Sequence, residues 1–228
     1  MQLPKITTAL LIPMCLHLSS HEASSATMLS LTANGQITSI ADLFGEFQGV
    51  NMGDRFSAQV TYDASTSDTI LAADQGNYKQ DIIANPALRA SITIHRSIGD
   101  LTFTTQSNFS IAARMFLTED NIQIASMNPG IFADPRIDVS FLIPVLLVDS
   151  SATALSTDSF PAGFLSSGAM NLSPFNRSQM LLQYVDNDTL TVGSLVGNIT
   201  SIVVIPEPST FVSICLTAIC SLFRRVRR

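Results

Sequence analysis

Hydrophobic and polar residues alternate one by one in several short segments between residues 27 and 205. A period of two is typical of a β-strand that buries one face and exposes the other. The clearest segment covers residues 55–62, where Phe, Ala, Val and Tyr take the alternate positions. Further strands are predicted at residues 92–95, 101–104, 122–124, 137–141, 145–148, 181–185 and 190–204.

Turn signals separate these segments. Asn34 and Gly35 stand between two apolar stretches, residues 29–32 and 37–40. Asn-Gly favours the type I′ turn between antiparallel strands, so this region predicts a hairpin. Helix signals are weaker, and residues 85–90 and 111–117 have room for a turn or two each. The pattern therefore predicts an all-β domain, an antiparallel β-sandwich or jelly-roll-like fold.

Residues 1–26 have the layout of a secretory signal peptide. A lysine and the terminal amine carry positive charge, residues 6–18 form an apolar stretch, and small residues lead to a cleavage position after Ala26. The apolar stretch is too short to span a bilayer. We therefore expect a signal-peptide helix that directs a domain of residues 27–205 out of the cytoplasm. The alternative is an amphipathic helix of the fold, which two prolines disfavour.

Residues 206–228 form a distinct C-terminal segment. Residues 209–223 carry no charge, and as a transmembrane helix they would extend about 22 Å, against about 30 Å for the hydrocarbon core of a bilayer. Four arginines close the chain: Arg224, Arg225, Arg227 and Arg228. Because positive charge stays on the cytoplasmic side, these stop-transfer charges predict that the preceding domain lies outside the cytoplasm.

This C-terminal segment resembles the PEP-CTERM sorting signal of exported bacterial proteins. The motif Pro206, Glu207 and Pro208 is followed by a short apolar segment and an arginine cluster, in the order and spacing of that family. The resemblance implies a Gram-negative bacterium that makes extracellular polysaccharide. It also implies processing by an exosortase, a membrane-embedded cysteine protease. The C-terminal segment would then be a removable sorting signal and not a permanent transmembrane anchor. The alternative is an ordinary tail anchor.

Part of the middle region is also similar to a recurring ectodomain of PEP-CTERM proteins. The residues that carry this similarity are 53–56, 62–68 and 76–78, with 196–201 before the sorting motif. The similarity implies a fold and a location, and it implies no activity.

The middle region has an unusual charge and cysteine content. Residues 27–205 contain no cysteine, which excludes a disulfide framework and cysteine-ligated metal sites. They hold sixteen acidic and seven basic side chains, a net charge of −9. Because a phosphate backbone would be repelled, nucleic-acid binding is disfavoured.

One loop has candidate metal ligands. Asp63, Asp68 and Asp74 cluster after the strand that ends near Tyr62, and Asp81 follows them. Carboxylate oxygens in an exported β domain suit Ca²⁺. The alternative is that these aspartates only form turns on a solvated loop.

Signals for catalysis and for sugar binding are few. His95 is the only histidine of residues 27–205, and it alternates with Ile92 and Ile94, which places it on the solvent face of a strand. The sequence contains no nucleophile elbow, P-loop or zinc-protease motif. A hydrolytic pair of carboxylates is left open, because spacing alone does not reveal one. The sequence contains no Trp, and this disfavours the prediction of an aromatic platform for carbohydrate binding.

These observations predict an exported cell-envelope or extracellular-matrix protein with a structural or adhesive role and no catalytic activity. We expect its precursor to be anchored in the inner membrane through the C-terminal helix until an exosortase processes it. Exopolysaccharide is a candidate partner, and calcium is the one candidate cofactor. The alternatives are a calcium-dependent carbohydrate-binding module and a hydrolase with a carboxylate pair.

Overall fold

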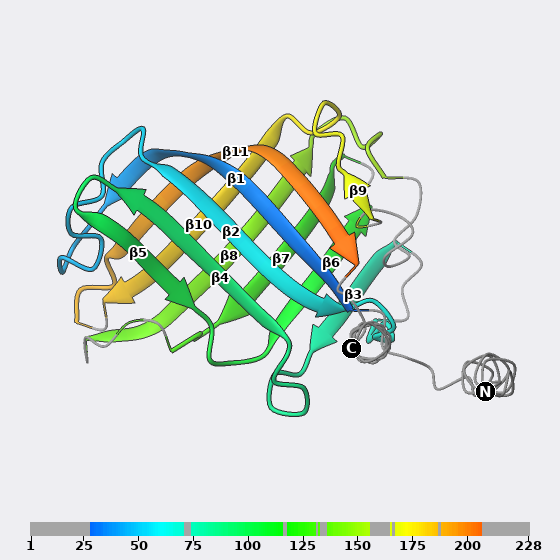
Figure 1. Ribbon diagram of the computed structural model, residues 1–228, viewed down its shortest axis with the longest axis horizontal. Helices are drawn as coiled ribbons and strands as arrows, with labels where there is room; N and C mark the ends of the chain where they lie inside the picture. Colours follow the sequence, from blue (N-terminus) through cyan, green and yellow to red (C-terminus); the bar gives the residue numbers. More distant parts are fainter. Residues whose placement is uncertain are drawn as a thin grey trace, which may run out of the picture. The chain divides into compact units, whose positions relative to one another are not determined.

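Eleven β-strands and no helix make up the described part of the chain (Figure 1). The computed structural model describes residues 28–70, 74–115, 118–130, 132, 136–155, 165, 167–186 and 188–206. The strands are β1 (Met28–Ala41), β2 (Arg55–Asp63), β3 (Gln75–Gln80), β4 (Arg89–Arg96), β5 (Gly99–Thr104), β6 (Phe109–Met115), β7 (Asp120–Met127), β8 (Ile137–Asp149), β9 (Gly168–Ala169), β10 (Arg177–Asp186) and β11 (Val192–Pro206). The all-β prediction is confirmed for these residues.

All eleven strands belong to one antiparallel sheet. Its strand order is β3-β6-β7-β8-β10-β11-β1-β2-β4-β5, and β9 pairs with β11 beside this path. The first and last strands, β1 and β11, are therefore neighbours in the middle of the sheet. The short strands β3 and β5 form its two edges.

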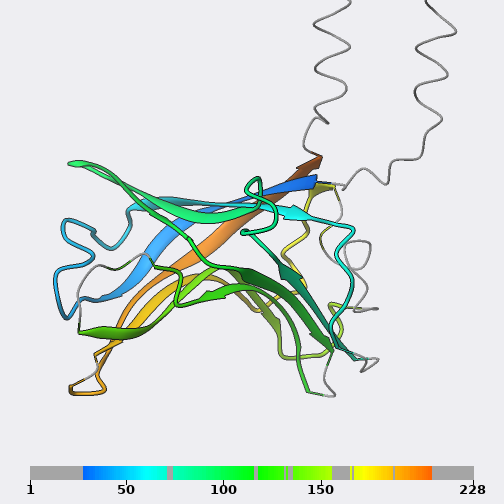
Figure 2. The same cartoon turned by 90° about the horizontal axis from the view of Figure 1, so that it is seen from below.

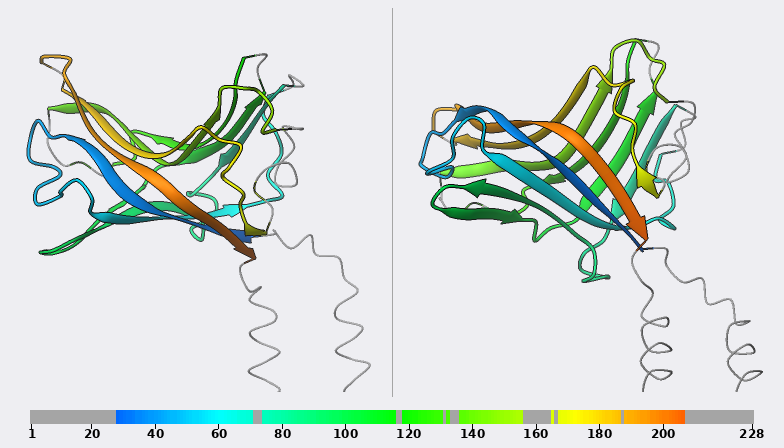
Figure 3. Two further views of the ribbon diagram at one scale, coloured as in Figure 1. Left: turned by 90° about the horizontal axis from the view of Figure 1, so that it is seen from above. Right: turned by 45° about the horizontal axis from the view of Figure 1, so that its top comes forward.

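The sheet bends strongly, so that its two halves face each other (Figure 2). One half contains β1, β2, β4 and β5, the other contains β3, β6, β7 and β8, and β10 and β11 lead from one to the other (Figure 3). β2 and β4 contact β8 across the interior. Side chains at alternate strand positions fill this interior, among them Val60, Ile94 and Val145, each fully buried.

Glycines allow aromatic rings to lie directly on neighbouring strands near the bend. Phe56 covers Gly35 of β1 and Gly197 of β11, since a Cβ on either glycine would lie within 2.6 Å of the Phe56 ring. Tyr184 of β10 covers Gly193 of β11 in the same way. A glycine inside a strand often marks such a close approach, because it has no side chain to displace.

The predicted hairpin at Asn34 and Gly35 is wrong. Both residues lie inside β1, which pairs with β2 on one side and with β11 on the other. Asn34 pairs with Ser201 and Gly35 with Ile199, so Thr200 is the extra residue of a β-bulge. Pairing on both edges keeps this backbone extended, which overrides the local turn preference of Asn-Gly.

The predicted helical turns are also absent from the described residues. Residues 111–115 lie in β6, between β3 and β7, and residues 82–88 form turns before β4. Residues 111–115 are extended and not helical because the backbone N–H and C=O groups of β6 form hydrogen bonds with both neighbouring strands.

An aromatic cluster packs at one end of the core beside the loop after β1. It consists of Phe44, Phe47, Phe103, Phe132 and Tyr184, with neighbouring ring centroids 5.2 to 6.1 Å apart. Asp42 accepts hydrogen bonds from the backbone N–H groups of the residues at 45, 46 and 47. The same carboxylate accepts one from the Tyr184 hydroxyl, so the loop is fastened to β10.

The predicted terminal helices fall outside the described residues. The signal peptide with its cleavage position at Ala26 is one of these segments. Glu207, Pro208 and the four terminal arginines belong to the other, whereas Pro206 ends β11. Among the described residues, no helix has the length and apolarity needed to cross a membrane.

Candidate binding groove on the outer face of the sheet

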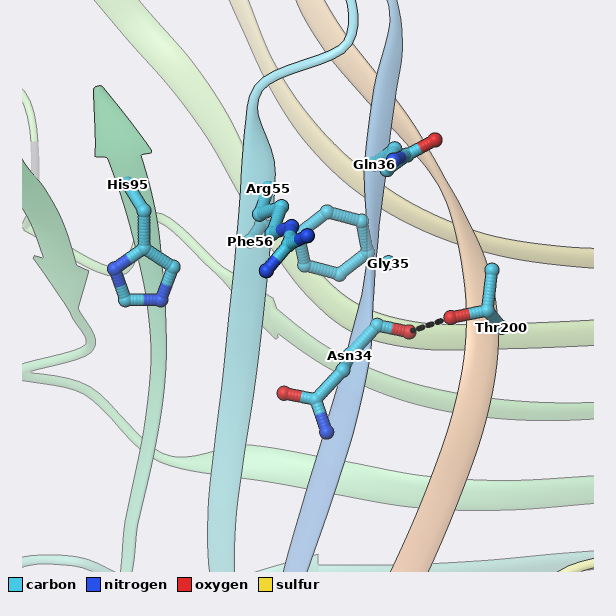
Figure 4. A pocket seen from close by; sticks show the side chains of 7 residues that line it. All are labelled: Asn34, Gly35, Gln36, Arg55, Phe56, His95 and Thr200. Atoms are coloured by element: carbon cyan, nitrogen blue, oxygen red, sulfur yellow. Dashed lines mark hydrogen bonds between the residues drawn. The ribbon is translucent and has the colours of Figure 1, made fainter. Parts of the chain in front are cut away.

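A groove of about 620 Å³ lies on the outer face of the sheet, where β4, β2, β1 and β11 run side by side (Figure 4). Its lining residues are Asn34, Gly35, Gln36, Arg55, Phe56, His95 and Thr200. The exposed members project outward from alternate strand positions, whereas Gly35 and Phe56 are buried beneath them. The groove is therefore a polar surface feature with an aromatic ring under its floor.

Strand register sets the positions of the main polar groups. Gln36 pairs directly with Arg55, and Arg55 pairs directly with His95. Directly paired residues of antiparallel strands point to the same face of the sheet. The β-bulge adds Thr200, whose hydroxyl donates a hydrogen bond of 3.2 Å to the backbone carbonyl of Asn34 (Figure 4).

The groove has a local excess of positive charge in an acidic domain. Its lining contains one arginine, one histidine and no carboxylate. The Arg55 side chain is exposed, and its guanidinium forms no ion pair or hydrogen bond with any described residue. An unpaired guanidinium offers a planar fork of donors that matches a carboxylate or a phosphate.

His95 lies on the solvent face of its strand, as the alternation predicted. Its Nε2 lies 3.3 Å from Oγ of Ser57, and its Nδ1 lies 3.1 Å from Oδ1 of Asp100. This connectivity is that of a Ser-His-Asp triad. The Asp100 side chain is 59% exposed, however, whereas a triad aspartate is buried.

Ser57 also lacks the surroundings that acyl transfer requires. It lies inside β2, which pairs with β1 and β4, so nearby backbone N–H groups serve the sheet ladder. An oxyanion hole needs donors that are free to face the developing charge. Ser57 and Asp100 therefore hold the His95 ring in place at the groove.

The aspartates of the predicted calcium site act as local hydrogen-bond acceptors. Oδ1 of Asp63 accepts from the N–H and the hydroxyl of Ser65, at 2.8 and 2.6 Å. Oδ1 of Asp68 accepts from the N–H groups of Ile70 and Asn77, at 2.9 and 2.8 Å. These contacts are those of turn-forming aspartates.

The structure does not bring the predicted ligands together. The backbone carbonyl of Asp74 accepts a hydrogen bond from the backbone N–H of Met115. Within the described ranges, no three His, Cys, Asp or Glu side chains form a group that could hold a metal ion. Calcium binding remains a prediction.

A buried aspartate elsewhere shows the same use of carboxylates in turns. Asp149, at the end of β8, accepts hydrogen bonds from the Ser151 hydroxyl, the Thr153 N–H and the Ser151 N–H. These bonds hold the pKa of the Asp149 carboxyl well below its ordinary value, the Ser151 hydroxyl having the largest effect. The carboxylate thus stabilises the turn after β8.

Sequence reasoning did not predict Asn34, Gln36, Arg55 and Thr200 as site residues. No binding or catalytic motif marks them, because they come from three strands and β11 lies more than a hundred residues after β1 and β2 in the chain. The period-two pattern does place Arg55 on the outer face of β2 and His95 on the outer face of β4, and this alternation is the local signal for the groove. Comparison of the chain with protein-family models, with curated proteins and with solved structures finds no match.

Proposed function

We propose that this chain is an exported protein of the cell envelope or extracellular matrix, with an adhesive or structural role. The observation that carries the proposal is the three-part C-terminal segment: the Pro206-Glu207-Pro208 motif, a short apolar stretch and a terminal arginine cluster. A signal-peptide layout at residues 1–26 supports the same route, because it requires the same orientation in the membrane.

The fold of the exported domain suits this role. We propose that the bent sheet works as a sandwich-type ectodomain whose two halves enclose one core. Its outer face presents Ser, Thr, Asn and Gln side chains at alternate positions of β1, β2 and β4. Such a surface is well hydrated and forms hydrogen bonds with hydroxyl-rich partners.

A binding role without catalysis is supported by the groove itself. The groove is open and polar. Among its lining residues, His95 is the one side chain that could act as a general base, and it lies beside a solvent-exposed aspartate. Carbohydrate binding is the second candidate function, and the groove favours it because amide and hydroxyl side chains line its rim. The calcium dependence of such binding rests on the sequence alone, and an unchanged melting temperature at millimolar Ca²⁺ would count against it.

Intact mass spectrometry of the exported protein tests the sorting proposal. In a strain with an active exosortase, we expect a chain that lacks residues 1–26 and the arginine cluster. A Glu207→Ala variant is expected to keep its C-terminal segment, because the sorting motif is broken. An exported species that still ends at Arg228 in the exosortase-positive strain would contradict the proposal.

A further inference from the structure

A row of polar side chains crosses the outer face of the sheet at right angles to the strands. Its members are direct cross-strand partners, each one strand further along: Asp100, His95, Arg55, Gln36, Asn198 and Gln179. All six are exposed or half-exposed. We call this set the polar row. With neighbouring strands about 4.8 Å apart, it extends over about 24 Å.

Two grooves contain members of the polar row, and a third groove adjoins the second. The groove of Figure 4 contains Gln36, Arg55 and His95. A second groove, of about 450 Å³, contains Asn198 and Gln179 together with Arg177 of β10. A third, of about 410 Å³, shares Asn176 and Arg177 with the second, lies over β7 and β8, and is also lined by the carboxylate of Glu119. The first two grooves have no lining residue in common, so these are separate hollows on the outer face. We call the first two grooves together the track.

The chemistry of the track combines amides with unpaired guanidinium groups. Asn and Gln side chains both donate and accept hydrogen bonds, as the hydroxyl groups of a sugar do. The guanidinium of Arg177, like that of Arg55, forms no ion pair or hydrogen bond with any described residue. Guanidinium groups bind carboxylates through two parallel hydrogen bonds. The first two grooves contain these two guanidinium groups and no carboxylate, whereas Asp100 ends the polar row and Glu119 lines the third groove. Arg55 and Arg177 are therefore the positions where an anionic ligand would bind.

We propose that the polar row, together with Arg177 beside Gln179, binds a linear acidic polysaccharide. The carboxylates of the polysaccharide lie at Arg55 and Arg177, and its hydroxyl groups lie at the amides. This inference rests on the proposed adhesive function and specifies its ligand class. A peptide that adds a strand needs a free sheet edge, whereas β4, β2, β1 and β11 are each paired on both sides.

Binding of the purified full chain to polygalacturonate, measured by isothermal titration calorimetry, tests this proposal. Dextran serves as the neutral polymer and polyglutamate as the acidic polymer without sugar. We expect binding to polygalacturonate alone, weakened by added salt because exposed charges are screened. Arg55→Gln is expected to weaken the affinity about tenfold, which is the loss of one charge-assisted contact. The Arg55→Gln/Arg177→Gln variant is expected to lose more.

Arg89→Gln is the matched control, because Arg89 is an exposed arginine of β4 outside all three grooves. We expect it to bind within about twofold of the unmodified chain. Equal losses for Arg55→Gln and Arg89→Gln, no binding of polygalacturonate, or equal binding of dextran or polyglutamate would each overturn the proposal. The intact-mass experiment decides export and sorting separately, so failure of polysaccharide binding leaves that result unchanged.

Discussion

The hydroxyl of Tyr184 donates a hydrogen bond of 3.1 Å to Oδ1 of Asp42 and so ties β10 to the loop after β1. The same hydroxyl oxygen accepts hydrogen bonds from the backbone N–H groups of Leu43, at 2.7 Å, and Phe44, at 3.3 Å. Tyr184 is fully buried, and its ring belongs to the aromatic cluster. One side chain therefore fastens the loop that borders the core.

Removal of this hydroxyl should destabilise the protein. Tyr184→Phe keeps the ring but leaves the loop N–H groups without their acceptor, and we expect a loss of about 1–3 kcal/mol in the free energy of unfolding. Urea denaturation provides the measurement. Gln59→Ala, on the exposed face of β2, is the control and should change stability by less than about 0.5 kcal/mol. A Tyr184→Phe protein as stable as the control would show that the network contributes nothing.

Gly35 and Gly197 both lie against the Phe56 ring, and an alanine at each should be relieved to a different degree when Phe56 is also replaced. A Cβ on Gly197 would meet mainly the Phe56 ring, at 2.5 Å, whereas one on Gly35 would also overlap the backbone carbonyl of Asn198. Each Gly→Ala change should cost about 1–3 kcal/mol through overpacking. In double variants, Phe56→Leu should relieve Gly197→Ala more than Gly35→Ala, because the overlap of Gly35→Ala with the backbone carbonyl of Asn198 remains when the Phe56 ring is removed. Equal relief in a thermal-denaturation cycle would contradict this packing.

Alkaline pH should weaken the fold through the buried tyrosines. Burial raises the pKa of Tyr62 above its ordinary value near 10, and burial is also the largest cause of the raised pKa of Tyr184. A raised pKa means that the folded state keeps the proton after the unfolded chain has lost it. Stability is therefore present in full below about pH 10 and falls as the pH rises above that value.

The contribution of Tyr62 can be separated by substitution. Its hydroxyl donates a hydrogen bond of 3.1 Å to the backbone carbonyl of Leu165. Tyr62→Phe should be less stable at pH 7, and its free energy of unfolding should decline less steeply between pH 9 and 11 than that of the unmodified chain. Parallel declines would show that Tyr62 ionises no differently in the folded and unfolded states.

The Ser57–His95–Asp100 network should have no hydrolytic activity. Its exposed aspartate and the absence of free backbone donors at Ser57 argue against an acyl-transfer site. We expect p-nitrophenyl acetate to be hydrolysed in the presence of the chain at the background rate of the buffer, and we expect the same rate for the His95→Ala variant. A rate that falls in both His95→Ala and Ser57→Ala, with the fold intact, would instead identify the network as catalytic.

Local alternation was enough to predict many of the strands. The apolar and polar residues of 55–62 alternate without a break, and they form β2 with Phe56, Val60 and Tyr62 buried. Residues 92–95 and 101–104 likewise fall in β4 and β5. In a half-buried strand, apolar residues alternate with polar ones, so the sequence of the strand alone shows which side chains are buried. The neighbouring strands do not have to be known.

Pairing and register could not be predicted in this way. β1 pairs with β11, more than a hundred residues further along the chain, and this pairing turns the Asn34-Gly35 signal into part of a bulged strand. The polar row depends on the same long-range register, because Gln36 meets Asn198 only when β1 and β11 are aligned. The candidate site therefore depends on the pairing of strands that are distant in the sequence, and a local sequence motif cannot predict such pairing.

The side-chain amide signals of the nitrogen-15-labelled protein test the polar row most directly. In two-dimensional NMR spectra recorded during titration with polygalacturonate, the amide groups of Gln36, Asn198 and Gln179 should shift together. The amide of Gln59, on the same outer face but outside the grooves, should not move. Shifts confined to amides outside the polar row, or no shifts at saturating polymer, would contradict the account.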